Sequence, residues 1–435
     1  ARFTDFESQL VDSTFLILTH DQLFNASTNY AAYRRSSGFE VEIIRVRELF
    51  DQYGYGVPGN PLAIRNLIKD NAQNWSNPIT HLLLLGKSVG TKDYRKNSVD
   101  QAQNLVPSFG NPATDNLLIS GINSAQTVPA IPIGRVSART PTELTDYLNK
   151  LIEYETAPSA KWMKEALHFA GGKSEQESAI YESYLNDYAT DFEGEGYGGR
   201  ARLFKKSSSA PIQTTLADSI RTLINSGVSL MTFFGHASAN DGFDISIDTP
   251  DKLQNRGRYP LMLANSCFTG NYHQANSIST GEDYVLEKNK GAIAYIATGN
   301  LGYAFFLDRY SRTFYDKLTE EFYGAEIAEV MRQTAIELSQ SNPNEQLKRV
   351  ALEMSLQGDP AVKLNPFPIA DYQVLESNVS VLPNEVTTDL DTFEIRINVE
   401  NIGRATSDTV LLLVRRSFPN AYRLDTSYII ELQEL

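Results

Sequence analysis

Three things are scarce in this sequence: cysteine, long apolar runs and an excess of positive charge. Of the 435 residues only Cys267 is a cysteine, which excludes an internal disulfide. Apolar runs such as residues 82–85 fall far short of the ~20 residues that a membrane-spanning helix needs. The net charge of −14 disfavours nucleic acid and anionic membrane surfaces, which attract basic proteins. We therefore expect no nucleic-acid partner and no direct membrane span.

The start of the chain has no targeting pattern. No charged stretch followed by an apolar stretch opens the sequence, and the chain begins at Ala1 without a methionine. We expect the chain to be a processed or excised piece of a larger protein. Its start therefore carries no information about the cellular compartment.

What the sequence does contain is an alternation of strand-like and helix-like segments. Residues 14–19 and 39–44 are short apolar runs, and a segment of helical periodicity lies between them. This order is typical of parallel sheets with crossover helices. The pattern predicts an α/β fold of two subdomains, residues 1–158 and residues 159–366, each with a parallel-rich sheet.

The pattern changes after residue 366. Residues 392–400 alternate strictly between apolar and polar, which indicates a half-buried antiparallel strand, and residues 409–416 and 428–432 predict further strands. We predict an all-β, immunoglobulin-like sandwich over residues 367–435. Because these residues are fewer than the ~100 of a complete sandwich, we expect the domain to be truncated in this chain.

Two apolar runs of strand length each end in a reactive side chain, His236 after residues 230–234 and Cys267 after residues 261–265. Neighbouring parallel strands end at the same edge of a sheet, so the two side chains can meet there. An imidazole that takes the thiol proton creates the thiolate that attacks a peptide carbonyl. A lone cysteine is otherwise a small buried hydrophobe, but the histidine favours catalysis. His273 is the rival base.

The segments around these residues carry a resemblance. FGHAS at 234–238 and ANSC at 264–267 are similar to the histidine and cysteine motifs of the gingipain family of cysteine peptidases. Segments that recur along that family are also present, namely PAIPIGRV at 129–136, GAIAYIA at 291–297 and GDPAVKL at 358–364. The resemblance covers residues 10–366 and implies a caspase-like sheet with an immunoglobulin-like neighbour. Within the family the chain most resembles the sortase of the type IX secretion system.

The resemblance implies Cys267 as the nucleophile and His236 as the base. The backbone N–H groups of Cys267 and Ala237 would then form an oxyanion hole. The family usually has glycine where Ala237 stands, but alanine still supplies an N–H group.

A third group is needed to orient the imidazole. The family's acid in the loop before the helix falls at Lys173, so the neighbouring Glu175 and Glu177 are the candidates. Acids at these positions also suit the start of a solvated helix. Asp241 and Asp244, just past the histidine, compete for the same role.

The resemblance also bears on specificity. Relatives that cut after arginine or lysine place an acid in the substrate pocket, and here the corresponding position is Ala179. The motifs suggest Phe234, Asn265 and Tyr303 as the other pocket residues. We predict that the residue before the scissile bond is small or uncharged. Glu177, two residues from Ala179, is the alternative that would reverse this prediction.

We predict a cysteine endopeptidase or transpeptidase of the sortase kind, which cleaves C-terminal signals from secreted cargo. The alternatives are a secreted general protease of the gingipain type and a catalytically inactive surface-binding module. The predicted location is the extracellular face of the outer membrane or the medium. The predicted partners are the C-terminal domains of protein cargo and an outer-membrane barrel protein.

We expect no required cofactor or catalytic metal, because thiol and imidazole chemistry needs none. The sequence leaves a structural calcium ion open, since its ligands cannot be read from the residue pattern. The family often carries an acid where Lys87 stands, which weakens the case for a cation site at that loop.

Overall fold

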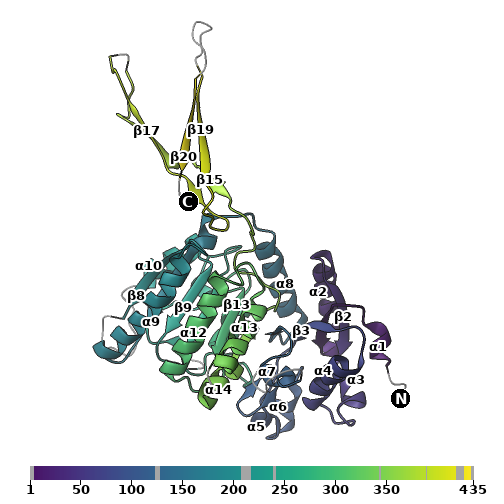
Figure 1. The fold of residues 1–435 in the computed structure, drawn as a ribbon. Coiled ribbons are helices and arrows are strands. Elements are labelled where there is room, and N and C mark those ends of the chain that lie inside the picture. The colour runs from purple at the N-terminus through teal and green to yellow at the C-terminus, as the bar shows by residue number, and fades with distance from the viewer. Residues whose placement is uncertain are drawn as a thin grey trace.

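One ten-stranded sheet runs through the computed structural model (Figure 1). The structure describes residues 4–122, 128–206, 217–238, 242–341, 344–387, 389–417 and 426–432. In spatial order the strands of the sheet are β2 (Glu40–Arg45), β1 (Thr14–Thr19), β3 (Ile79–Leu85), β6 (Ile133–Val136), β14 (Met354–Gln357), β13 (Ala294–Thr298), β12 (Leu261–Asn265), β9 (Leu230–Phe234), β7 (Glu165–Ala170) and β8 (Arg200–Lys205). The predicted α/β class with a parallel-rich sheet is confirmed.

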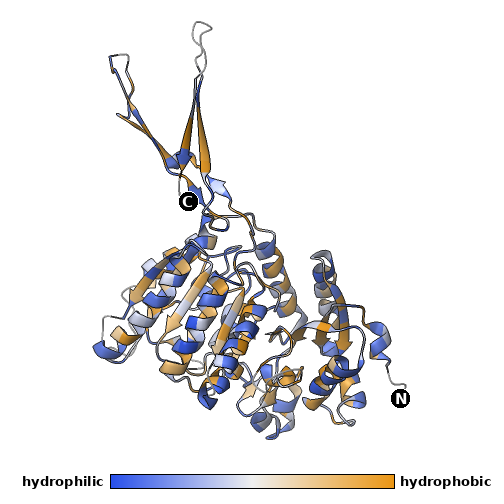
Figure 2. Ribbon diagram, in the orientation of Figure 1, coloured by the Kyte–Doolittle hydropathy of each residue, from blue (hydrophilic) through white to orange (hydrophobic). Residues whose placement is uncertain are grey.

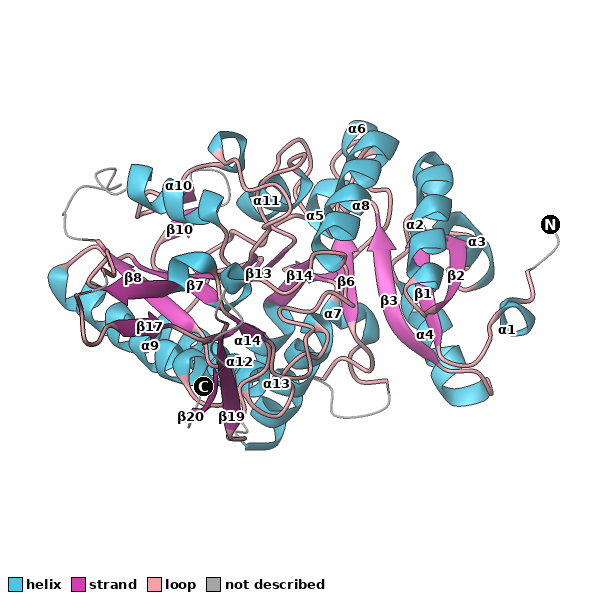
Figure 3. Cartoon of the chain, turned by 90° about the horizontal axis from the view of Figure 1, so that it is seen from above, coloured by secondary structure: helices cyan, strands magenta, loops and turns pink. Residues whose placement is uncertain are grey.

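Helices cover both faces of this sheet, as the view from above shows (Figure 3). One face carries α2 (Phe24–Ser36), α8 (Pro141–Glu155), α10 (Ala217–Ser226) and α11 (Thr280–Leu286). The other carries α4 (Leu62–Asn74), α9 (Glu175–Glu193), α12 (Ala304–Thr319), α13 (Ile327–Ser341) and α14 (Glu345–Glu353). Shorter elements are α1 (Phe6–Gln9), α3 (Val46–Gln52), and the 3-10 turns η1 (Asp21–Leu23), η2 (Lys161–Lys164), η3 (Pro250–Lys252) and η4 (Glu376–Asn378).

The apolar runs form strands because both faces of the sheet are covered. In β1, Phe15 and Ile17 join one core cluster, whereas Leu16 and Leu18 join the cluster on the opposite face. All four side chains are buried. Successive strand residues point to opposite faces, so a doubly covered strand needs a continuous apolar run.

Four strands of residues 159–366 are neighbours in the sheet. β7, β9, β12 and β13 lie side by side and are parallel. Their ends at Ala170, Phe234, Asn265 and Thr298 therefore lie along one edge, where ligands bind in sheets of this kind.

The strands of residues 1–158 occupy one end of the sheet, and those of residues 159–366 occupy the other. The two groups meet where Arg135 of β6 is paired with Gln357 of β14. A buried ion pair between Lys87 and Glu282, with 2.5 Å between Nζ and Oε1, also joins them. The boundary at residue 158, in the connection between α8 and η2, stays a prediction.

Residues 91–128 are polar and rich in turns, yet their described part contributes to the core. Their described part forms α5 (Thr91–Tyr94), α6 (Ser98–Ala102), α7 (Asn116–Ile119) and the strand pair β4 (Phe109–Gly110) and β5 (Ala113–Thr114). Val106 and Ile119 are buried. The buried guanidinium of Arg135 binds Asp115 at 2.7 Å, which fastens this polar segment to the sheet.

The C-terminal part is all-β, as predicted. Its strands form three two-stranded antiparallel ladders that project from the sheet, namely β15 (Tyr372–Gln373) with β18 (Glu400–Asn401), β16 (Val379–Leu382) with β17 (Glu394–Ile397), and β19 (Val410–Arg416) with β20 (Thr426–Leu432). Apolar residues line β19 and β20, as Figure 2 shows, and side chains such as Leu411 and Ile429 are exposed. Within the described residues these ladders do not join into one packed sandwich. In the same residues we find no helix long and apolar enough to cross a membrane.

Candidate active site

His236 and Cys267 follow two adjacent strands at the same edge. β9 and β12 are paired in parallel, with Phe234 opposite Asn265 as the last pair of the register. Each reactive residue lies two positions beyond its strand. The sheet therefore brings the predicted histidine and cysteine to one edge.

A strained turn presents the cysteine. Phe268, directly after Cys267, has a φ of 61°, which is unusual for a bulky residue. The N–H of Phe268 donates to the carbonyl of Asn300 at 2.9 Å, which holds the turn in place. Cys267 is partly exposed. Residues held in such conformations cluster at functional sites, because the surroundings must compensate the strain.

The sulfur of Cys267 lies at the start of a long helix. The N–H of Gly302 donates to Sγ at 3.4 Å, and Tyr303 is the N-cap of α12. An N–H group directed at sulfur and the N-terminus of a helix both favour negative charge there. Sequence reasoning missed Gly302. The signal was present as a glycine-containing turn after β13, directly before the helix.

The imidazole of His236 is paired with a carboxylate. Its Nε2 lies 3.0 Å from Oε1 of Glu177, and the same oxygen accepts the hydroxyl of Tyr181 at 2.9 Å. His236 and Glu177 are 33% and 30% exposed, so both are accessible without being free in solvent. If Nε2 carries the proton, Nδ1 keeps its lone pair and is available as the base.

The start of α9 fixes Glu177. The side chain of Ser174 accepts the N–H of Glu177 at 3.2 Å, and Oε2 of Glu177 accepts the N–H of Lys173 at 2.7 Å. Partial burial raises the pKa of Glu177, but bonds from Lys173, His236 and Tyr181 outweigh it and hold the pKa below its ordinary value. The serine followed three residues later by glutamate is a capping signature, which singles out Glu177 over Glu175.

The competing acids lie elsewhere. Glu175 is exposed at the first position of α9. The carboxylate of Asp244 accepts the N–H of Gly172 at 2.8 Å and lies 3.5 Å from Nζ of Lys206. The N–H of Asp244 donates to the carbonyl of His236 at 3.0 Å. Asp244 thus connects the loop that leads to Glu177 with the loop that carries His236. Asp241 lies outside the described residues.

The N–H of Ala237, one of the two predicted oxyanion donors, is not used in the strand pair that follows His236. After His236, β10 (Ala237–Ser238) pairs with β11 (Gly242–Phe243). The bond from Asp244 to the His236 carbonyl makes Ala237 and Phe243 a pair that is not hydrogen-bonded, so the N–H of Ala237 points away from β11. In the described residues no hydrogen bond joins Sγ of Cys267 to the imidazole. Catalytic hydrogen bonds are often loose in resting sites.

The residues suggested as pocket walls differ in exposure. Phe234 and Asn265 are each only 1% exposed and lie beneath the surface. Phe234 packs against the rings of Tyr181 and Tyr184. Tyr303 is 53% exposed beside the cysteine, and Ala179 is exposed on α9. The assignment of these four residues to a substrate pocket stays a prediction.

His273 is buried away from solvent. Its Nδ1 contacts the hydroxyl of Ser88, and its carbonyl accepts the N–H of Gly90 at 2.7 Å. Burial lowers the pKa of His273 to about 3, with a smaller opposing effect from Asp115. A histidine that stays neutral and inaccessible is a poor general base for an incoming peptide.

No group of three or more histidine, cysteine, aspartate or glutamate side chains is arranged to hold a metal ion within the described ranges. At the loop after β3, the Lys87 ammonium lies against Glu282 and 3.4 Å from the Ser277 carbonyl. A protein cation thus occupies this position.

An α/β sheet that delivers a thiol and a carboxylate-paired imidazole to adjacent strand ends defines a cysteine peptidase. The chain belongs to peptidase family C25, whose model matches residues 9–365. Among named relatives, Lys-gingipain HG66 of Porphyromonas gingivalis is 27% identical over 173 residues, and Lys-gingipain W83 of the same species is 27% identical over 176 residues. Each match covers 39% of this chain but only 10% of the relative, so it spans a small part of the relatives' length.

Two of the similar solved structures show the same fold. The complex of Porphyromonas gingivalis RgpB pro- and mature domains has a TM-score of 0.66 at 16% identity and covers 97% of this chain and 99% of that chain. The Arg-specific cysteine proteinase gingipain R (RgpB) has a TM-score of 0.66 at 15% identity, covering 100% and 99%. Dimeric latent PorU from Porphyromonas gingivalis has a TM-score of 0.41 at 15% identity, covering 98% and 39%.

Proposed function

We propose that this chain is the catalytic part of a sortase-like cysteine endopeptidase or transpeptidase. In this proposal Cys267 is the nucleophile, His236 is the base, and Glu177 orients the imidazole. The observation that carries the proposal is the 3.0 Å contact between Glu177 and His236 at the end of the strand adjacent to that of Cys267. A nucleophile, a base and an orienting group on rigid elements form the pattern of covalent catalysis.

The reaction begins when His236 takes the thiol proton and Sγ attacks the peptide carbonyl. The N–H groups of Cys267 and Ala237 would donate hydrogen bonds to the carbonyl oxygen and stabilise the negative charge that develops there. His236 then gives its proton to the leaving amine, and an acyl-enzyme remains on sulfur. Water or an amine resolves this intermediate, which gives hydrolysis or transpeptidation. These steps require no cofactor.

The residues around the site favour an uncharged side chain before the scissile bond. The Glu177 carboxylate already accepts bonds from His236, Tyr181 and Lys173. Asp308, on α12, is paired with Arg312 at 3.0 Å. A buried cation without a free carboxylate is costly, so arginine and lysine are disfavoured at this position.

The substrate class that we propose is the C-terminal signal of secreted cargo. Cleavage would take place at the extracellular face of the outer membrane or in the medium, with an outer-membrane barrel protein as a partner. Support for these points comes from the resemblance to the type IX sortase.

Two other functions remain distinguishable by experiment. A general gingipain-type protease would cut many unrelated proteins and accept arginine or lysine before the scissile bond. An inactive binding module would bind cargo without cleaving it. The accessible histidine with its carboxylate argues against the binding module, because a fold kept only for binding needs no such pair.

The test is a set of peptides that differ only in the residue before the scissile bond, together with a cargo protein carrying its C-terminal domain. We expect cleavage of the cargo and of peptides with small or uncharged residues, and no cleavage by Cys267→Ala. Preferential cleavage after arginine or lysine, lost in Glu177→Ala, would instead assign a general protease. Intact cargo, bound equally by both proteins, would assign a binding module.

A further inference from the structure

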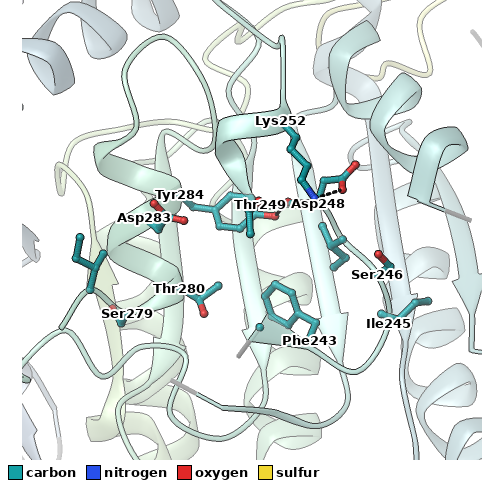
Figure 4. A pocket seen from close by; sticks show the side chains of 13 residues that line it. Phe243, Ile245, Ser246, Asp248, Thr249, Lys252, Ser279, Thr280, Asp283 and Tyr284 are labelled. Atoms are coloured by element: carbon teal, nitrogen blue, oxygen red, sulfur yellow. Dashed lines mark hydrogen bonds and ion pairs between the residues drawn. The ribbon is translucent and has the colours of Figure 1, made fainter. Parts of the chain in front are cut away.

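A cavity lies beside the candidate active site. Its volume is about 420 Å³, within the usual range of small-ligand sites. The chain that follows β11 forms one wall, and the segment that leads into α11 forms the other (Figure 4). The residues that matter for its chemistry are Phe243, Ile245, Asp248, Lys252, Ile278 and Asp283.

Both walls continue from the catalytic loops. On one side Phe243 is the strand partner of Ala237, the residue next to His236. On the other side, Gly281 in the first turn of α11 donates its N–H to the carbonyl of Thr269 at 3.2 Å. Thr269 lies two residues after Cys267. A peptide whose carbonyl lies at the cysteine therefore has this cavity as a neighbour.

The charges in the cavity are not evenly balanced. Asp248 accepts a hydrogen bond from Arg221 at 2.8 Å and lies 3.6 Å from Nζ of Lys252, so cations already neutralise it. Figure 4 shows Asp283 on the opposite side of the cavity from this pair. Within the described part of the chain Asp283 has no ion-pair partner. One carboxylate is therefore left for a ligand.

The surroundings of Asp283 favour the binding of a positive charge beside its carboxylate. Partial burial, first, and then the charges of Glu287, Asp251 and Glu282 raise the pKa of Asp283. A bound cation would offset both the cost of desolvating the Asp283 carboxylate and the repulsion among these acids. Apolar surface from Phe243, which lies between the two charged sides, and from Ile278 is available to an aliphatic stem.

We propose that this cavity binds a lysine or arginine side chain of the peptide substrate, at a position other than the residue before the scissile bond. The stem lies against Phe243 and Ile278, and the cationic head meets Asp283. Lysine and arginine combine these features, because a long apolar stem carries the charge. The inference rests on the proposed peptidase function and adds a second point of recognition to it.

The experiment varies one position at a time. Peptides with a constant uncharged residue before the scissile bond carry lysine, norleucine or glutamine singly at each of the other positions. At one position we expect lysine to exceed norleucine in kcat/KM by about two- to fivefold, the effect of a partly exposed ion pair. Asp283→Asn should reduce this ratio to near one. Asp251→Asn, which removes an equal charge near Asp283 but outside the cavity lining, should reduce the ratio much less.

Equal loss of the ratio in Asp283→Asn and Asp251→Asn would overturn the inference, because a general electrostatic field would then explain the preference. Cleavage of all peptides without any lysine preference would also overturn it and leave the peptidase function intact. If no peptide is cleaved, the peptidase proposal fails, and binding decides the inference. Nα-acetyl-lysine N-methylamide should bind the Cys267→Ala protein more tightly than its norleucine counterpart, and Asp283→Asn should abolish the difference. Equal binding would overturn the inference.

Discussion

Two regions next to Cys267 each hold a histidine, and they have opposite character. His236, beyond β9, is 33% exposed and faces the carboxylate of Glu177. His273, only six positions after the cysteine in sequence, is buried and contacts Ser88 of the N-terminal strand group. Nearness in sequence thus does not place a histidine for catalysis, whereas the paired strands β9 and β12 bring His236 and Cys267 to the same edge of the sheet. The His236 region is arranged as a reactive site, whereas the His273 region connects the two strand groups of the sheet.

The difference shows what each region depends on. The His236 region relies on a few hydrogen bonds at loop ends, which can change without unfolding the sheet. The His273 region relies on burial, and burial holds its ring neutral. Variants of the first region should therefore alter the reaction, and variants of the second should alter stability.

The largest expected effect is a difference in kcat/KM between variants of the two histidines. His236→Ala should lower kcat/KM by about 10²–10⁴, the usual contribution of a general base. His273→Asn should leave kcat/KM within a few-fold of wild type at a temperature where both proteins are folded. Steady-state kinetics on one cleavable peptide, with circular dichroism to confirm folding, measures both. Comparable losses in the two variants would break the comparison.

The next effect concerns the acid that faces His236. Glu177→Gln should lower kcat by at least about tenfold, because an orienting carboxylate can contribute up to ~10⁴ in related triads. Its pKa lies below the ordinary value, so Glu177 becomes protonated at a lower pH than an ordinary glutamate does. The gap between wild type and Glu177→Gln should therefore persist at mildly acidic pH.

Glu175→Gln is the matched control, since the same charge is removed two residues away on the exposed side of the helix start. Its pH–rate profile should superimpose on that of the wild type. A larger loss of kcat for Glu175→Gln than for Glu177→Gln would show that Glu175, and not Glu177, orients the imidazole.

A smaller effect is expected at Asp244, which links the loop before Glu177 to the loop that carries His236. Asp244→Ala removes the acceptor for Gly172 and should loosen the loop before Glu177, at a cost of about tenfold in kcat, because small displacements of catalytic groups are costly. Asp244→Asn retains an oxygen acceptor and should recover most of the activity. Its pH–rate profile should resemble that of the wild type, whereas that of Asp244→Ala should resemble Glu177→Gln. Equal activity of the two Asp244 variants would exclude this positioning role.

The smallest effect is confined to the second region. Between the ordinary pKa of 6.5 and the folded pKa of about 3, unfolded His273 binds a proton that the folded protein does not. Stability therefore falls as pH falls, by about 2 kcal/mol from pH 7 to pH 5 for this group. His273→Asn should be less stable at pH 7 but should show a shallower loss toward pH 5 in denaturant titrations. Parallel pH dependence in the two proteins would show that His273 is not buried as a neutral ring.

Much of the catalytic edge could be predicted from local patterns. The runs ending before His236 and Cys267 are apolar on both faces, and such runs are typical of buried parallel strands. Contacts between distant segments were less accessible. The polar segment around Asp115 enters the core because Arg135 needs a buried partner, which no local pattern indicates. Likewise, Gly302 lies against the sulfur only because β13 is adjacent to β12.

The most direct test of the central claim is the reactivity of the single cysteine. The protein is treated with a peptide carrying a thiol-reactive group after an uncharged residue, and the adduct is followed by intact-mass spectrometry over time. We predict one adduct on Cys267, none in Cys267→Ala, and a rate that falls steeply in His236→Ala but not in His273→Asn. An equal labelling rate in wild type and His236→Ala would contradict the account, because Cys267 would then react without the imidazole.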